Sequence, residues 1–222
     1  MIHLVLIGDL IASRHITDRA ATQTLLAAAL KRLNRTSRPS LTSPYTLTLG
    51  DEFQAVFHRA DTVFQDIVSL MHQLEPVQIR FSLALGEITT ALNHRQALAM
   101  DGPAFYRARA GIDHLKGSGD LLAVSGLPAP CQELTTGSLR LVGHVMEKWR
   151  PNRLAILQRL MAEEPVKDIA KALQISEPAV YKNITMGNLD AVMQLLTAVS
   201  TNLNAELIHE DQNKLSADEA SS

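Results

Sequence analysis

The sequence lacks the residues and motifs that mark several protein classes. Cys131 is its only cysteine, which excludes an intramolecular disulfide and a cysteine-rich zinc framework and fits a reducing compartment. No basic side chain adjoins Cys131, so we interpret it as incidental rather than catalytic. The eight histidines form no His-Glu-x-x-His motif, and there is no P-loop, nucleophile elbow or internal repeat. These absences argue against zinc enzymes, P-loop NTPases and α/β-hydrolases.

Long apolar runs and an excess of charge of one sign are also missing. The 222 residues include 21 Lys and Arg against 23 Asp and Glu, so no overall positive charge attracts nucleic acid or membrane. The N-terminal run HLVLIGDLIA is short, lacks a basic leader and contains an aspartate, which favours a buried strand over a signal peptide. We therefore predict a cytoplasmic protein without a membrane partner, in which any DNA contact is local.

Apolar periodicity predicts alternating strands and helices over residues 1–126. The predicted strands are 3–11, 45–49, 53–57, 77–88 and 121–124, and the predicted helices are 18–34, 61–74 and 103–115. The order β-α-β-β-α-β, with a further helix and strand, is that of a ferredoxin-like α+β domain, an antiparallel sheet with helices on one face. In that topology the first strand lies next to the hairpin formed by the second and third strands.

The remainder of the chain predicts an all-α domain. Residues 127–138 have the composition of a linker, residues 139–204 form the helical domain, and the acidic, Ser-rich tail 205–222 is expected to be disordered. A long helix over 139–162 is expected to be interrupted near Pro151. Apolar residues at helical spacing over 189–203 indicate a further helix that could mediate a homodimer.

The hairpin TLTLGDEFQAVF carries acidic residues at its tip. If the first strand lies beside this hairpin, Asp9 at the end of that strand and Asp51 at the tip converge, with Glu52 next to them. Two aspartates can hold Mg²⁺ or Mn²⁺, which in turn binds the phosphates of a nucleotide. The other interpretation is that Gly50 and Asp51 form an ordinary turn and that Asp9 merely ends a strand. Both interpretations are open at this point.

The segments LIGDLIASR, TLTLGDEFQAVF, IRFSLALGEITT and MDGPAFYRARAGI, together with the helical region, resemble the SatD family. More distantly they are similar to class III nucleotidyl cyclases, and LGDEF resembles the GGDEF signature of diguanylate cyclases. The cyclase resemblance implies a metal-dependent nucleotide site with Asp9 and Asp51 as the metal ligands. It also implies that the triphosphate lies near the backbone of Leu10, Ile11, Ala12 and Ser13.

Other cyclase landmarks are replaced in this sequence. The base-reading lysine falls on Leu47, and the catalytic asparagine and arginine fall on Tyr106 and Ala110. Arg107 and Arg109 stand close enough to Ala110 to supply a phosphate-directed cation, although exposed helix arginines are often simply solvated. Metal and phosphate binding is therefore better supported than cyclisation.

The stretch VKDIAKALQISEPAVYKNI, residues 166–184, predicts a helix-turn-helix. Ile169, Ala170, Val180 and Ile184 would face inward, and Ser176 would cap the second helix. In this motif the second helix presents its early residues to the major groove of DNA. The predicted DNA-facing residues are Ser176, Glu177, Ala179, Tyr181, Lys182 and Asn183. The alternative is a helical hairpin that contacts a protein, because the recognition face is not strongly basic.

Together the patterns give one leading hypothesis and two alternatives. The leading hypothesis is a regulator in which a metal-nucleotide or other phosphorylated-ligand domain is joined to a DNA-binding helix-turn-helix. The first alternative is a divergent nucleotidyl cyclase or other nucleotide-processing enzyme. The second is a non-catalytic interaction or dimerisation protein.

Overall fold

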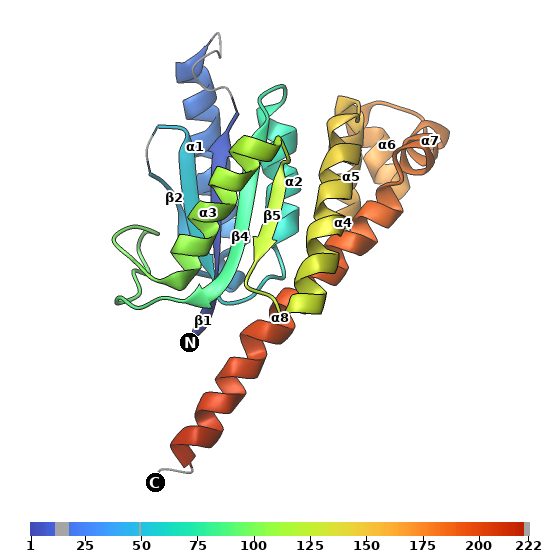
Figure 1. The fold of residues 1–222 in the computed structure, drawn as a ribbon. Helices are drawn as coiled ribbons and strands as arrows, with labels where there is room; N and C mark the ends of the chain where they lie inside the picture. The colour runs from blue at the N-terminus through green and yellow to red at the C-terminus, as the bar shows by residue number, and fades with distance from the viewer. Residues whose placement is uncertain (12–17, 49, 220–222) are drawn as a thin grey trace.

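The computed structural model describes residues 1–11, 18–48 and 50–219. It consists of a five-strand mixed sheet with interleaved helices, followed by an all-helical region (Figure 1). The strands are β1 (Ile2–Leu10), β2 (Leu41–Leu47), β3 (Glu52–Phe57), β4 (Ile79–Glu87) and β5 (Leu122–Ser125). The helices of the sheet region are α1 (Arg19–Thr36), the short 3-10 helix η2 (Arg38–Ser40), α2 (Val63–Leu74) and α3 (Pro103–Ser118). The helical region contains α4 (Ala129–Glu147), α5 (Pro151–Met161), α6 (Val166–Leu173), α7 (Glu177–Gly187) and α8 (Leu189–Glu219).

The strand order is β2-β3-β1-β4-β5. The predicted adjacency of the first strand and the hairpin is confirmed, because β1 pairs with β3 on one side and with β4 on the other, both antiparallel. The prediction of an antiparallel sheet is wrong at one edge, where β5 runs parallel to β4. The reason is that α3 carries the chain back along the sheet, so the next strand enters in the same direction as β4.

Helices cover both faces of the sheet, which corrects the expectation of helices on one face only. Leu4 and Leu6 of β1 pack in the core that includes α1 and α2, while Val5 and Ile7 pack in the core that includes α3. Figure 1 shows α3 on the face of the sheet opposite to α1 and α2. In the middle of β1, both sets of alternate residues are apolar and buried, so both faces of this strand require a cover. The central strands are consequently buried along almost their whole length.

Two glycines shape the end of the sheet where Asp9 lies. Gly8 faces Phe53 across the β1–β3 pair, and a β-carbon at Gly8 would lie 2.2 Å from the Phe53 ring. Gly50 turns the hairpin with a φ of 67°, a conformation that favours glycine. These two positions allow β1 and the hairpin tip to approach closely.

The linker predicted over 127–138 is wrong for residues 129–138, which form the first half of α4. Prolines signalled a loop, but Pro128 takes the N-cap position and Pro130 lies in the first turn, where proline is tolerated. The helix expected over 139–162 is interrupted near Pro151 as predicted, with α5 beginning at that residue. The helical region therefore follows β5 almost directly.

The predicted helix-turn-helix is present as local structure in α6, a short turn and α7. Ser176 caps α7, its hydroxyl oxygen accepting from the Ala179 amide at 3.3 Å. Gln174, where glycine is common, adopts a left-handed conformation with φ 54°. Ile169, Ala170, Val180 and Ile184 are buried as expected.

Helix α8 continues to Glu219, through most of the segment from residue 205 for which disorder was predicted; the disorder itself stays a prediction. Asn204 ties α8 to the sheet region: its side-chain oxygen accepts from the Ala60 amide at 2.7 Å and its nitrogen donates to Asp61 at 2.7 Å. The apolar stripe expected to mediate a dimer is largely buried within the chain, so the homodimer stays a prediction; its buried members are Leu189, Val192, Leu196, Val199 and Leu203. Among the described helices, none is long and apolar enough to cross a membrane.

Candidate functional site

The candidate site lies where β1 ends beside the hairpin tip. In the strand register Asp9 stands opposite Glu52 of β3 and opposite Arg80 of β4. The Leu10 amide donates to the Asp51 carbonyl oxygen at 3.2 Å, which places Asp51 directly next to the end of β1. Asp9 thus meets the consecutive acids Asp51 and Glu52, which are more than 40 residues away in the sequence, at one end of the sheet.

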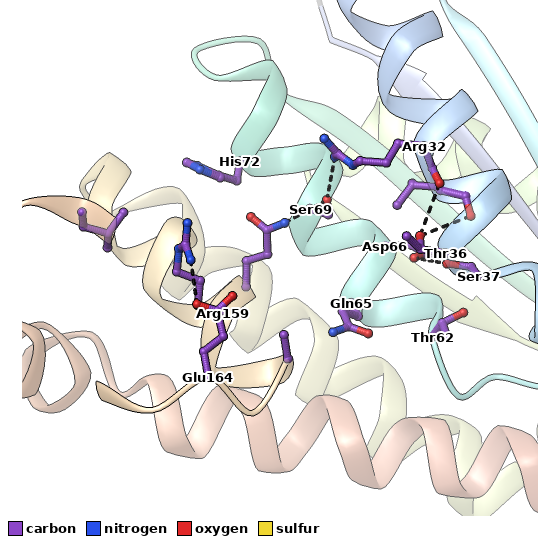
Figure 2. Close-up of a pocket in the computed structure, with 14 residues that line it drawn as sticks. Arg32, Thr36, Ser37, Thr62, Gln65, Asp66, Ser69, His72, Arg159 and Glu164 are labelled. Atoms are coloured by element: carbon purple, nitrogen blue, oxygen red, sulfur yellow. Dashed lines mark hydrogen bonds and ion pairs between the residues drawn. The ribbon is translucent and has the colours of Figure 1, made fainter. Parts of the chain in front are cut away.

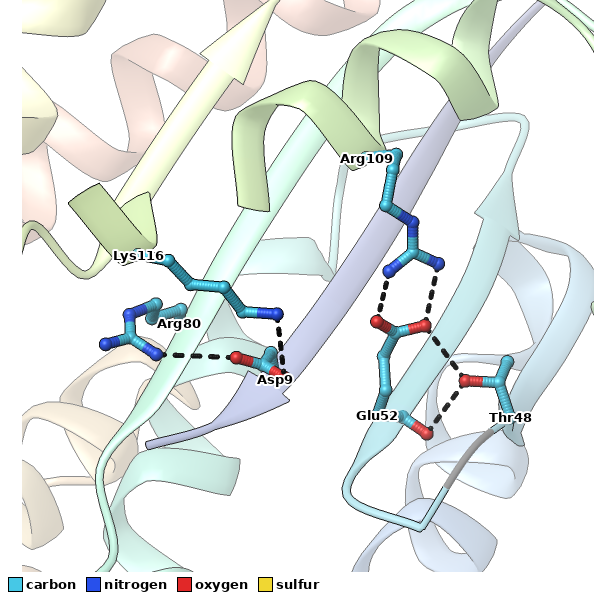
Figure 3. A network of polar contacts seen from close by, with 6 residues as sticks. All are labelled: Asp9, Thr48, Glu52, Arg80, Arg109 and Lys116. Atoms are coloured by element: carbon cyan, nitrogen blue, oxygen red, sulfur yellow. Dashed lines mark hydrogen bonds and ion pairs between the residues drawn. The ribbon is translucent and has the colours of Figure 1, made fainter. Parts of the chain in front are cut away.

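Asp9 is buried and faces two cations from different elements. Its carboxylate oxygens lie 3.4 Å from an Arg80 guanidinium nitrogen and 3.6 Å from Lys116 Nζ of α3 (Figure 3). Burial raises the pKa of Asp9, Lys116 and Arg80 oppose that rise, and the Asp51 and Glu52 carboxylates add to it. The net shift of the Asp9 pKa is upward, which means that the surroundings disfavour the ionised carboxylate. A further positive charge beside Asp9 would stabilise the ionised form.

Glu52 is held by Arg109 and Thr48. Both terminal nitrogens of Arg109 donate to the Glu52 carboxylate, one of them at 2.8 Å, and the Thr48 hydroxyl donates to it at 3.0 Å (Figure 3). Burial by itself would raise the pKa of Glu52, but the hydrogen bonds and charge of Arg109 outweigh it and lower the pKa. The same hydrogen bonds raise the pKa of Arg109. Glu52 therefore stays ionised and fixes Arg109 over the sheet.

Lys116, Arg80 and Thr48 are site residues that the sequence reasoning missed. Lys116 follows Arg109 by seven residues on α3, which is two helical turns, so helical periodicity places both on one face. Arg80 lies on the strand paired with β1, but the partner strand and its register had to be known first. The signal for Lys116 was thus readable, whereas that for Arg80 was not.

The predicted phosphate-binding backbone is only partly described. The Leu10 amide is used by Asp51, and the Ile11 amide donates to the Gln78 carbonyl at 2.8 Å. Because both amides already donate to backbone carbonyls, neither is free for phosphate. Leu10 is also buried in the core, and Ile11 is partly buried. Ala12 and Ser13 lie outside the described residues.

The two arginines that were predicted to bind phosphate have different contacts. Arg109 reaches the site, whereas Arg107 donates to the Leu85 carbonyl at 2.8 Å and does not join the contacts around Asp9 and Glu52. Tyr106, at the cyclase asparagine position, donates to Asp101 at 2.8 Å and is 60% exposed. Of these α3 residues, Arg109 alone has the described contact with the acidic cluster.

The acidic residues at this end of the sheet do not form a complete metal cage, and both carboxylate oxygens of Asp9 already face a cation. No group of three or more His, Cys, Asp or Glu in the described ranges could hold a metal by itself. Mg²⁺ and Mn²⁺ are commonly held by one or two carboxylates while phosphate and water complete the coordination. Burial chiefly, and Asp51 and Glu52 to a smaller extent, raise the pKa of Asp9, and a divalent cation there would favour its ionised form. A metal held by Asp9 and Asp51 would therefore need phosphate and water to complete its coordination.

The predicted DNA-facing residues of α7 are unequally available. Glu177, Lys182 and Tyr181 are exposed, Tyr181 by 56%. Asn183 and Ala179 are half-buried, and the Asn183 side chain donates to the Ala179 carbonyl at 2.9 Å. Ser176 is exposed but serves as the helix cap. Met186, 65% exposed on the same helix, was not predicted as a surface contact.

Comparisons with known proteins identify a family and distant structural likenesses. The sequence profile of the SatD family matches residues 3–195. No curated protein shows significant sequence similarity to the chain. Among solved structures, two of a bacterial light-regulated adenylyl cyclase each align with 56% of this chain, covering 75% and 43% of theirs, at 15% and 14% identity and TM-scores of 0.42 and 0.41. A regulator of polyketide synthase expression from Bifidobacterium adolescentis aligns over 90% of this chain and 84% of its own, at 13% identity and a TM-score of 0.23.

Proposed function

The chain belongs to the SatD family, and we propose that it is a regulator whose sheet region binds a phosphate-bearing small molecule with Mg²⁺ or Mn²⁺. In this proposal, ligand binding in the sheet region changes how the helical region binds DNA. The observation that carries the proposal is the meeting of Asp9 and Asp51 with Lys116 and Arg109 at one end of the sheet. Paired acids suit a hard cation, and the neighbouring cations suit the anion that such a metal accompanies.

Each residue has a distinct part in this proposal. Asp9 and Asp51 would hold the metal, which supplies positive charge against phosphate when bound. Lys116 would contact phosphate oxygens as a mobile point charge, since its present partner is Asp9. Glu52 would position Arg109 and compete with phosphate for its guanidinium group. The ligand therefore has to be anionic enough to share Arg109 with Glu52.

The proposed scaffold is the ferredoxin-like fold, because the order β2-β3-β1-β4 with antiparallel pairing is the arrangement of a βαββαβ unit. Binding is favoured over cyclisation on this scaffold. Leu47 has no polar group with which to read a purine, and Ala110 has no charge for a transition state. A nucleotide-processing activity would require cations other than those expected from the cyclase pattern.

For the helical region, we propose DNA contact through α7, with Lys182 on phosphate and Tyr181 at a base edge. A second candidate is a protein partner. The observation that favours it is the exposure of Tyr181 and Met186 on the same helix, since aromatic residues and methionine are enriched at protein interfaces. DNA binding through this surface would depend on few charges and would be weak for a single copy.

A thermal-shift titration of the full chain tests the metal-phosphate site. Nucleoside triphosphates and cyclic nucleotides are added with and without Mg²⁺ or Mn²⁺, and a saturable, metal-dependent rise in Tm with at least one of them is expected. The double variant Asp9→Asn, Asp51→Asn should lose this rise. Glu87→Gln, an exposed carboxylate at the opposite end of β4, is the matched control and should keep it.

An unchanged rise in the double variant would remove the metal-phosphate site from the proposal. Measuring pyrophosphate in the same samples separates binding from turnover, because a cyclase releases it and a binding domain does not. For α7, mobility shifts on a pool of random duplexes should weaken in Lys182→Ala and in high salt. A shift that is insensitive to Lys182 would favour the protein partner.

A further inference from the structure

The molecule also has a polar cavity whose lining shares no residue with the acidic cluster. It is a partly open cavity of about 310 Å³, lined by residues of α1 and α2 of the sheet region and of α5, α6 and their connection in the helical region (Figure 2). Its walls include Arg32, Asp66, Ser69, Gln158 and Arg159. A volume of this size lies at the lower end of small-molecule sites.

Hydrogen-bond donors outnumber acceptors around Ser69, which is buried on the cavity wall. Its hydroxyl oxygen is approached by Gln73 at 2.7 Å, by Gln158 at 3.1 Å and by Arg32 at 3.3 Å. A hydroxyl has two lone pairs and therefore cannot satisfy three donors well at once. The donors come from α1, α2 and α5, so both parts of the molecule present N–H groups at the same point.

The acceptors on the cavity wall already have partners. The two oxygens of buried Asp66 accept from the Ser37 hydroxyl at 2.6 Å and the Tyr45 hydroxyl at 2.9 Å. Glu164 accepts from Arg159 at 2.6 Å. Among the described contacts, Arg32 and Gln158 therefore meet the Ser69 hydroxyl rather than a carboxylate.

Two further polar atoms of the cavity lining are buried without a hydrogen bond. Within the described part of the chain, Thr62 Oγ1 and His72 Nδ1 have no hydrogen-bond partner, the nearest His72 ion-pair oxygen, on Glu75, being 3.8 Å away. Buried polar groups are rarely left unpaired in native proteins. Thr62 and His72 therefore add polar atoms without a hydrogen bond to the lining of the cavity, although only Ser69 shows a surplus of donors.

From these contacts we infer that the cavity binds a small anionic metabolite, whose phosphate or carboxylate group is held by Arg32 and by the side-chain amide of Gln158. Arg32 supplies a charged, forked donor and Gln158 a neutral one from the opposite wall. The ionisable groups lining the cavity are Arg32, Arg159 and His72 against Asp66 and Glu164. Burial raises the pKa of Asp66 to about 7, which reduces its repulsion of an anion at neutral pH.

Such a ligand would link the two parts of the chain. Gln158 and Arg159 belong to α5, and Leu173, the last residue of α6, also lines the cavity. An anion held between Arg32 and Gln158 would therefore favour one placement of α6 and α7 against the sheet region. This inference does not rest on the metal-phosphate site, and either can fail without the other.

The test uses the full chain in a buffer free of phosphate and metal. Inorganic phosphate, glycerol 3-phosphate and succinate are titrated separately while Tm and the fluorescence of Trp149, the single tryptophan, are followed. At least one probe should raise Tm saturably. Arg32→Gln and Gln158→Glu should each weaken the apparent affinity by about tenfold or more, because each removes or opposes a donor to the anion.

Two controls keep the result specific. Arg35→Gln changes an exposed arginine on the same helix that does not line the cavity, and it should bind as the parent chain does. Asp9→Asn should also leave the affinity unchanged, which separates this cavity from the sheet-end site. The inference is overturned if no probe raises Tm at about 20 mM, if Arg32→Gln and Gln158→Glu bind normally, or if Asp9→Asn abolishes binding. Circular dichroism of each variant confirms that it is folded.

Discussion

Glu52 and Asp66 are both buried carboxylates, yet their surroundings drive their pKa values in opposite directions. Glu52 at the sheet end is paired with the Arg109 guanidinium, and its pKa is lowered. Asp66 in the core under α1 and α2 is paired only with the hydroxyls of Ser37 and Tyr45, and burial raises its pKa to about 7. Hydroxyl partners satisfy the hydrogen bonds of a carboxylate but do not neutralise its charge.

The difference separates a carboxylate that can take part in ionic recognition from one that belongs to the core. At the sheet end, charged residues from four elements meet near solvent, with Arg109 46% exposed. The hydrogen-bond partners of Asp66 are neutral hydroxyls, and no described ion pair joins it to the basic residues of the cavity. We therefore expect changes at Asp66 to affect stability and changes at the sheet end to affect binding.

The largest expected effect is the pH dependence that Asp66 gives to stability. Its pKa is about 7 in the folded chain and about 3.9 when unfolded, so the folded state binds more protons between these values. The free energy of unfolding should therefore fall as pH rises from about 4 to about 7, by at most about 4 kcal/mol relative to Asp66→Asn. Urea denaturation at a series of pH values measures this difference.

Asp61 provides the matched control for this pH series. The pKa of Asp61 is lowered, chiefly by its hydrogen bond with Arg59, so Asp61→Asn should retain the fall in stability with rising pH. If the free energy of unfolding changed equally with pH in the parent chain and in Asp66→Asn, Asp66 would be ionised normally in the folded chain. The contrast between Asp66 and Glu52 would then be wrong.

The next effect is the loss of the Tyr45 hydroxyl. Tyr45→Phe removes a buried hydrogen bond to Asp66 and should lower the free energy of unfolding by about 1 to 2 kcal/mol near neutral pH. Tyr106→Phe removes a similar bond to Asp101 from an exposed tyrosine and should change it by less than about 0.5 kcal/mol. Chemical denaturation of both variants makes the comparison, and equal losses would contradict the role of burial.

A smaller effect is expected when the Glu52 ion pair is broken. Glu52→Gln should lower the free energy of unfolding by about 1 kcal/mol or less, because solvent screens the half-exposed Arg109. The loss should shrink in about 1 M salt. The loss in Tyr45→Phe should not shrink in this way, since no charge pair is removed. A salt-independent loss in Glu52→Gln would mean that packing, not charge, is the main contribution of Glu52.

The smallest effect on stability is expected at Asp9. Asp9→Asn should change the free energy of unfolding by less than about 1 kcal/mol, because burial and the acids nearby oppose the ionised form while Lys116 and Arg80 favour it. The same variant should lose the metal-dependent nucleotide shift. Denaturation and thermal-shift assays on one preparation check both outcomes, and a large loss of stability would place Asp9 with the structural carboxylates.

Local patterns predicted most helices and strands, but not which helices cover each face of the sheet or the direction of its edge strand. Alternating and helical spacing located all five strands, and Ser176 marked the start of α7. The sequence reasoning failed at Pro128 and Pro130, where proline signals both loops and helix starts, and only packing of α4 decides between them. It also failed for the parallel edge strand β5, whose direction depends on how α3 crosses the sheet.

By itself, the sequence determined which short segments become strands and helices and which residues carry charge, because these depend on neighbours along the chain. It also indicated that Asp9 and the hairpin acids would meet, given one topology. Only the tertiary structure decided that Arg80 and Lys116 face Asp9, that Arg109 and not Arg107 holds Glu52, and that Asp66 lies between hydroxyls. Strand register, helix rotation and burial set those contacts, and each depends on residues far apart in the chain.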